Sequence, residues 1–273
     1  MNIIFKIAKA ELRNLFYSPV AWFLGIIFMV QCAFFYTGSI YGLAKMQEYL
    51  MESPDFKVLD YILTPTVFGD VFKSVMQNLF LFIPLLTMGI LSREVNSGSI
   101  KLLYSSPIKT RDIVLGKYLS LMVFTLMLST ILGIFMITAC FNIKAIDYGI
   151  LVSASLGFYL LVCAYAAIGL FMSSLSTYQI VSAIATFTII FVLGMIGTLW
   201  QQIDFVRDLT YFLSISGRTS KMLKGLITTK DVFYFLIVSS MFLAFTLIKL
   251  KSGRESKSKI LTASKYFAVL GIA

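Results

Sequence analysis

The chain has 273 residues, of which 59% are hydrophobic and 13% are charged. Soluble domains are about 45–50% apolar and about 25% charged, so this composition excludes an ordinary soluble protein. It predicts an all-α membrane protein, because helices satisfy their own backbone hydrogen bonds in lipid. The net charge of +10 is expected to hold cytoplasmic loops on an anionic leaflet rather than to bind nucleic acid.

Residues 1–19 predict an amphipathic helix that lies in the membrane interface. Lys6, Lys9 and Arg13 share one face of this helix, and apolar side chains share the other. Glu11 falls on the apolar face. It is either a simple solvated acid or the partner of a basic residue in a neighbouring loop, such as Arg93.

Residues 20–249 contain six apolar runs of a length that can cross a bilayer as helices. These runs are 20–43, 74–91, 118–140, 148–172, 178–200 and 232–248. None of them contains Asp, Glu, Lys, Arg or His, which disfavours a proton- or ion-coupled pump. The polar segment 201–231 is expected to form short helices that dip into the outer leaflet.

The distribution of basic residues predicts the orientation of the spans. The larger share of the 23 Lys and Arg residues falls on segments that share a side with the N-terminus, so both termini are expected in the cytoplasm. Residues 250–273 then form a cytoplasmic tail. Its apolar end, from Tyr266, is either a frayed end or the beginning of a truncated seventh span, and we favour the truncated span.

The sequence carries no recognisable catalytic, cofactor or metal site. It has no histidine, and Cys32, Cys140 and Cys163 lie in apolar runs, where small buried hydrophobes are expected. The phosphate-binding pattern G-x-x-x-x-G-K-[ST] is also absent, so the chain is not expected to hydrolyse ATP. Any uphill transport would take its energy from a partner protein.

The segment 92–117, SREVNSGSIKLLYSSPIKTRDIVLGK, is basic and punctuated by Gly and Pro. It resembles the cytoplasmic loop of type-2 ABC exporter permeases in the order of Glu94, Gly98, Leu103, Ser106-Pro107, Ile113 and Gly116-Lys117. The N-terminal helix resembles the connecting helix of that family, and residues 224–254 are similar to its final outer loop and span. The gliding-motility-associated subfamily is the most similar, although Ser99 stands where the family more often has Thr.

The resemblance implies a six-span exporter permease in the bacterial cytoplasmic (inner) membrane, which is not itself an enzyme. The implied partners are an ABC-type ATP-binding subunit, which would bind the ATP, a second copy of the chain or a related permease, and membrane lipids. The implied contact with the ATP-binding subunit comprises Glu94, Gly98, Ile100, Leu103, Tyr104 and Pro107. Ile100, Leu103 and Tyr104 would be its apolar anchors, and Lys6, Lys9, Glu11 and Arg13 belong to the interfacial helix.

Three other functions stay open from the sequence. The chain could be a secondary transporter or channel, which the uncharged spans disfavour. It could anchor a motility or secretion assembly in the membrane without transport of its own. A membrane enzyme that acts on lipid is disfavoured by the missing histidine and the missing acids in the spans. The sequence does not identify a transported substrate.

Overall fold

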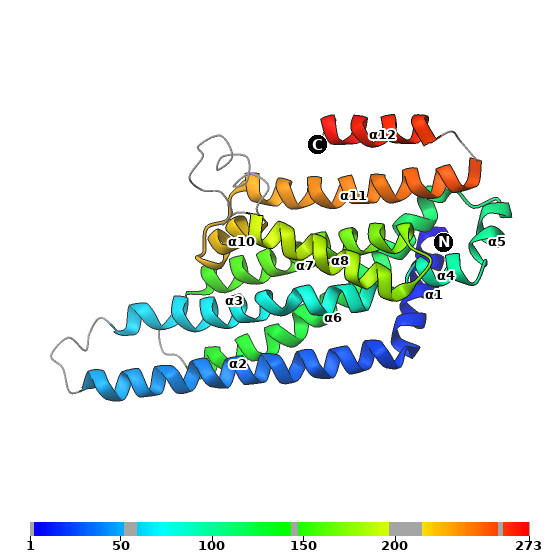
Figure 1. Cartoon of the computed structure of the whole chain (residues 1–273). Helices are drawn as coiled ribbons and strands as arrows, with labels where there is room; N and C mark the ends of the chain where they lie inside the picture. Colours follow the sequence, from blue (N-terminus) through cyan, green and yellow to red (C-terminus); the bar gives the residue numbers. More distant parts are fainter. Residues whose placement is uncertain (1–2, 52–58, 143–146, 197–214, 256–258, 273) are drawn as a thin grey trace.

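The computed structural model describes residues 3–51, 59–142, 147–196, 215–255 and 259–272. These residues form helices and contain no strand, which confirms the all-α prediction for the described chain (Figure 1). The helices are α1 (Ile3–Tyr17), α2 (Pro19–Met51), α3 (Leu59–Thr87), α4 (Ser92–Asn96), α5 (Ile100–Ser105), α6 (Thr110–Asn142), α7 (Tyr148–Leu175), α8 (Gln179–Met195), α10 (Ile215–Leu223), α11 (Thr229–Glu255) and α12 (Lys259–Ile272).

The long helices run side by side as a bundle, with α7 at its centre (Figure 1). Helix α7 contacts α3, α6, α8, α10 and α11. Small residues let other helices approach its backbone closely, since Ala164, Ala166, Ala167 and Gly169 are all buried there. At Gly169 an added Cβ would lie 2.1 Å from Thr87 Oγ1 on α3. The close packing of α3 against α7 therefore depends on contact between the Thr87 side chain and the backbone at Gly169.

Five helical segments are long and apolar enough to cross a membrane, which confirms a multi-pass architecture. They are Pro19–Met46, Gly69–Asn96, Thr110–Phe141, Tyr148–Leu175 and Thr229–Arg254. The remaining predicted span, 178–200, coincides with α8, which has 17 described residues. At 1.5 Å per residue α8 extends about 25 Å, somewhat less than the hydrocarbon core of about 30 Å. Residues 197–200 of the predicted run lie outside the described residues.

Helix α6 begins well before the span that the sequence predicts. Its first residue is Thr110 rather than Tyr118, so Arg111 and Lys117 belong to the helix and not to a connecting loop. Asp112 stands in the first turn, where a carboxylate interacts favourably with the positive end of the helix. The extension carries polar side chains of α6 beyond the apolar part of the bundle, next to α1.

Helix α1 crosses the end of the bundle that also carries α4 and α5 (Figure 1). Lys6, Lys9 and Arg13 are exposed on it, and so is the apolar Phe5. Part of its other face packs against α6, where an added Cβ at Gly116 would lie only 2.8 Å from Ile7 Cβ. Trp22 Nε1 donates a hydrogen bond to the Phe16 carbonyl oxygen at 2.6 Å, which fixes the corner between α1 and α2.

Helix α10 lies at the opposite end of the bundle from α1 (Figure 1). A short helix is therefore present within the predicted segment 201–231, of which residues 201–214 lie outside the described residues. Ser153 Oγ on α7 donates to the Met222 carbonyl oxygen at 2.7 Å. Arg218 forms an ion pair with Asp231 at 3.0 Å, and both side chains are buried. The sequence indicates only that both residues are charged members of the segment 201–231, and it does not predict that they pair.

Helix α12 lies alongside α11 (Figure 1). It begins at Lys259, before the apolar stretch that the sequence singles out from Tyr266. The Tyr266 ring packs against Phe245 of α11 with 5.4 Å between the ring centroids. The predicted tail therefore contains a helix that contacts the bundle.

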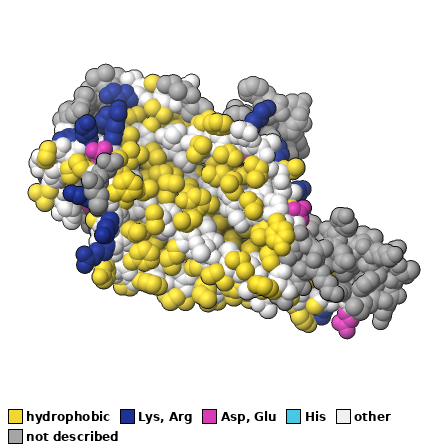
Figure 2. Space-filling view, turned by 180° about the vertical axis from the view of Figure 1, so that it is seen from behind, with side chains coloured by type: hydrophobic (Ala, Val, Ile, Leu, Met, Phe, Trp, Pro, Cys, Tyr) yellow, Lys and Arg dark blue, Asp and Glu magenta, His cyan; other side chains and the backbone are white. Residues whose placement is uncertain are grey.

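The surface separates into an apolar middle and a basic end. Figure 2 shows hydrophobic side chains over most of the visible face, with Lys and Arg gathered toward the end that carries α1, α4 and α5. Lipid solvates the apolar part of such a surface, and basic residues concentrate where it meets water. The segment 92–117 lies at this basic end of the bundle (Figure 1 and Figure 2).

Candidate functional site

The segment between α3 and α6 is held to the bundle through α7. Ser173 Oγ accepts hydrogen bonds from the backbone N–H groups of Leu91 at 3.0 Å and Ser92 at 3.1 Å. It donates in turn to the Met88 carbonyl oxygen at 3.0 Å. A buried hydroxyl of a distant helix thus satisfies the backbone where the chain leaves α3 and enters α4, and this fixes the direction of α4.

Gly98 forms the turn between α4 and α5 with a φ of +73°. This left-handed conformation costs an L-residue roughly 1–2 kcal/mol. Nothing lies within 4 Å of the position of an added Cβ, so only the backbone conformation restricts the residue here. The positive φ at this turn therefore explains why this position of the motif is a glycine.

Replacing Gly98 with alanine is expected to destabilise the α4–α5 segment by about 1 kcal/mol, because alanine disfavours positive φ. Hydrogen exchange of the α5 amides should become faster in this variant. Gly98→Asn is the matched control, since asparagine tolerates the left-handed region, and it should exchange more slowly than Gly98→Ala. Equal exchange in the two variants would contradict a role for the backbone angle.

The apolar residues of α5 do not all face outward. Ile100 is only 9% exposed and belongs to the core, whereas Leu102 is 73% exposed. Tyr104 is half-buried, and an added Cβ at Gly253 of α11 would lie 3.0 Å from its hydroxyl oxygen. Burial, and secondarily the nearby Glu94 carboxylate, raise the pKa of Tyr104 above its ordinary value. The Leu103 side chain lies outside the described residues.

Arg254 near the end of α11 binds the stretch between α5 and α6. Its guanidinium donates to the carbonyl oxygens of Ile108 at 3.1 Å and Ser106 at 3.2 Å. These bonds flank the exposed Pro107, which has no N–H to donate. The sequence offers no local signal for this contact, because the donor and acceptors lie in segments far apart in the chain.

Lys117 of α6 is at the centre of a buried ion cluster. Its ammonium donates to Glu11 Oε1 of α1 at 2.5 Å, to Glu94 Oε1 of α4 at 2.7 Å and to the Ile90 carbonyl oxygen at 3.1 Å. An ammonium group has three donors, so each of them has an acceptor. Lys117 is 1% exposed, although it is charged. One side chain thus connects α1, α4 and α6.

Glu11 therefore has a basic partner, as one of the two predicted alternatives requires, but the predicted partner, Arg93, is wrong. Glu11 pairs with Lys117 rather than with Arg93. Two structural reasons explain the difference. Lys117 is helical because α6 begins at Thr110, and the missing side chain of Gly116 lets α1 approach α6 closely enough for the pair to form.

The arrangement defines a multi-pass helical membrane protein in which the segment from α4 to the start of α6 is tied to α1, α6, α7 and α11 at one end. Residues 5–252 match the family model described as "ABC-2 family transporter protein". The chain belongs to this family, and the match supports its being a permease subunit of an ABC transporter. Such a permease works in general with an ABC ATP-binding partner. A comparison with curated proteins finds no match.

Proposed function

We propose that the chain is the permease subunit of an ATP-driven exporter, and that the α4–α5 segment docks on its ATP-binding subunit. The observation that carries this proposal is the Lys117 cluster, which connects α4 to α1 and α6. A partner that pushes on α4 would therefore move α1 and α6 with it. Rigid-body movement of packed elements is a common way to convert a binding event into a switch.

The docking face consists of the residues that the resemblance indicates, with the exposed Leu102 added and the buried Ile100 removed. Leu102, Leu103 and Tyr104 are the proposed apolar anchors, with Glu94, Gly98 and Pro107 beside them. Ile100 faces the core, so its proposed role is to hold α5 in position. Leu102 is 73% exposed, so its side chain would lose much contact with water if a partner covered it, and such burial of apolar surface favours binding.

The remaining features of the proposal follow from the resemblance and from the surface. Exposed basic residues gather at the α1–α4–α5 end (Figure 2), so that end, which carries α1 and the last turn of α11 (Figure 1), is assigned to the cytoplasmic side of a bacterial inner membrane. Helix α1 would lie in the interface there. Helix α8 would serve as the sixth span, and the chain would pair with a second copy or a related permease. A relation to gliding-motility permeases belongs to the same proposal.

Replacing Leu102 and Leu103 with aspartate tests the docking face. We expect affinity for the cognate ATP-binding subunit to fall at least about 30-fold, since burial of one leucine contributes about 1.5–3 kcal/mol and an aspartate in its place would bury an unpaired charge. Co-purification and ATPase stimulation in liposomes measure the effect. Leu226→Asp is the control, because Leu226 is 63% exposed at the opposite end of the bundle. Retained binding by the double variant, when inserted normally, would contradict the docking proposal.

A further inference from the structure

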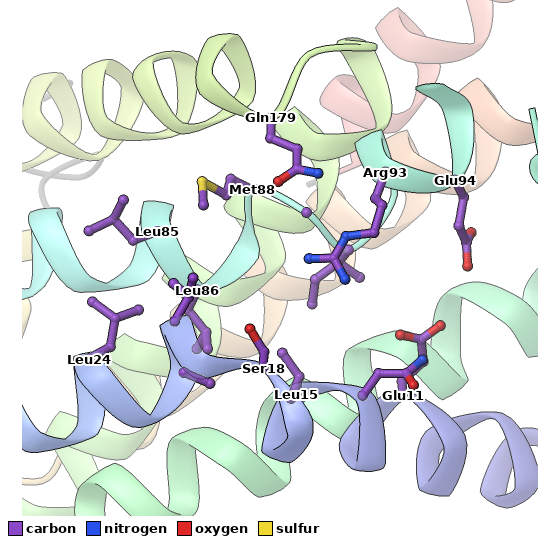
Figure 3. Close-up of a pocket in the computed structure, with 15 residues that line it drawn as sticks. Glu11, Leu15, Ser18, Leu24, Leu85, Leu86, Met88, Arg93, Glu94 and Gln179 are labelled. Carbon is purple, nitrogen blue, oxygen red and sulfur yellow. The ribbon is translucent and has the colours of Figure 1, made fainter. Parts of the chain in front are cut away.

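A pocket of about 180 Å³ opens between the corner of α1 and α2, the end of α3 and the beginning of α8 (Figure 3). Polar side chains line one part of it, namely Asn14, Ser18, Arg93 and Gln179. Leucines of α2 and α3, among them Leu24 and Leu85, line another part. The pocket therefore has a polar region near the basic end of the molecule and an apolar region along two membrane-crossing helices.

Arg93 supplies a positive charge to this pocket. Figure 3 shows its side chain directed into the space between the α1–α2 corner and α8. Among the described residues, no carboxylate forms an ion pair with its guanidinium. The guanidinium and the Gln179 amide converge over Gly89, where an added Cβ would lie 3.1 Å from Arg93 Nη2 and 3.6 Å from Gln179 Oε1. The glycine leaves room for both groups.

Two carboxylates also line the pocket, and they share one cationic partner. Glu11 and Glu94 both bind the Lys117 ammonium, which lies buried between them. Arg93 is therefore the cation of the pocket that is available to a ligand. A guanidinium presents paired N–H donors that match the oxygens of a phosphate group.

The geometry points to a binding site for a glycerophospholipid of the surrounding leaflet, with its phosphate on Arg93 and its chains against α2 and α3. A volume of about 180 Å³ is below the range of about 300–1,000 Å³ of pockets that enclose a drug-sized molecule, which suits a headgroup rather than a whole lipid. Val20 and Leu85 at the pocket are exposed apolar residues that would continue the contact along the chains. This inference does not depend on docking of the ATP-binding subunit.

Native mass spectrometry of the full chain in detergent, titrated with phosphatidylglycerol, tests the site. Arg93→Gln is expected to weaken lipid binding at least tenfold, because it removes the charge and the paired N–H donors that would hold the phosphate. Arg93→Lys should bind more tightly than Arg93→Gln, because it retains the charge. Lys9→Gln is the matched control, because it removes one exposed charge from the same end of the molecule outside the pocket. It should change binding less than twofold.

Two further measurements test whether the bound phosphate group belongs to a lipid or is free inorganic phosphate. Diacylglycerol with the same chains lacks phosphate, and it should bind Arg93→Gln and the unaltered protein equally weakly. Inorganic phosphate at millimolar concentration should not displace phosphatidylglycerol, because it has no chains to contact α2 and α3. Equal loss in Arg93→Gln and Lys9→Gln, tight binding of diacylglycerol, or displacement by inorganic phosphate would each overturn the lipid site.

Discussion

Replacing Lys117 with methionine is expected to destabilise the protein by about 3 kcal/mol, because removal of one partner from a buried ion pair costs about 3–5 kcal/mol. The side chains of Glu11 and Glu94 are 18% and 23% exposed, so water relieves part of the penalty and the lower end of this range applies. Without the ammonium, the two carboxylates repel each other between α1 and α4. Thermal unfolding in detergent at neutral pH measures the loss.

Lys109→Met is the matched control for this experiment, since Lys109 is exposed and immediately precedes α6. It should change the unfolding temperature little. Adding Glu11→Gln and Glu94→Gln to Lys117→Met removes the unpaired charges, and we expect the triple variant to recover at least half of the lost stability. A triple variant as unstable as Lys117→Met alone would show that the cluster does not act through charge.

The same cluster predicts a functional consequence beyond stability. If α4 transmits the movement of a docked partner through Lys117, a Glu11→Ala variant, which removes the bond to α1 and leaves the docking face unaltered, should still bind the ATP-binding subunit while its ATPase stimulation falls. Binding depends on the exposed face of α5, whereas transmission depends on the bonds to α1 and α6. Separate measurements of affinity and of stimulated ATPase activity therefore distinguish docking from coupling.

Hydropathy was sufficient to predict the class of the protein but not the extent of its helices. Lipid forces apolar runs of about 20 residues into helices, so the five long spans could be read directly from composition. The residues at which a helix begins and ends are determined by weaker sequence preferences. The N-terminal turns of α6 contain polar residues that no hydropathy criterion assigns to a span. Their helical structure depends on local backbone bonding and on packing against α1.

The position of the candidate site could be predicted from the motif in residues 92–117, but its internal contacts could not. The partners of Glu11, Leu91 and Arg254 are Lys117, Ser173 and the backbone beside Pro107. Each of these contacts joins segments far apart in the chain, so their geometry exists only after the helices pack. Periodicity also could not decide which side of the short helix α5 faces the core, and Ile100 therefore lies inside although it resembles an anchor.

Replacing Gly169 with alanine is expected to destabilise the bundle by about 1–2 kcal/mol. Alanine favours a helix over glycine by about 1 kcal/mol, so propensity alone predicts the opposite sign. The added Cβ would, however, lie 2.1 Å from Thr87 Oγ1 and 2.7 Å from Thr87 Cβ. Thr87 cannot easily rotate away, because its hydroxyl donates to the Ile83 carbonyl oxygen at 2.8 Å and its side chain is fully buried. Helices α3 and α7 must therefore separate.

Gly133 on α6 provides the matched control for the Gly169 substitution. Nothing lies within 4 Å of its added Cβ, so Gly133→Ala gains helix propensity without a clash and should raise the unfolding temperature in detergent. The two substitutions are chemically identical and differ only in what surrounds them. Opposite signs would establish that close approach of α3 to the central helix, rather than helix propensity, determines the packing. A stabilising Gly169→Ala would mean that α3 and α7 are not in contact at this position.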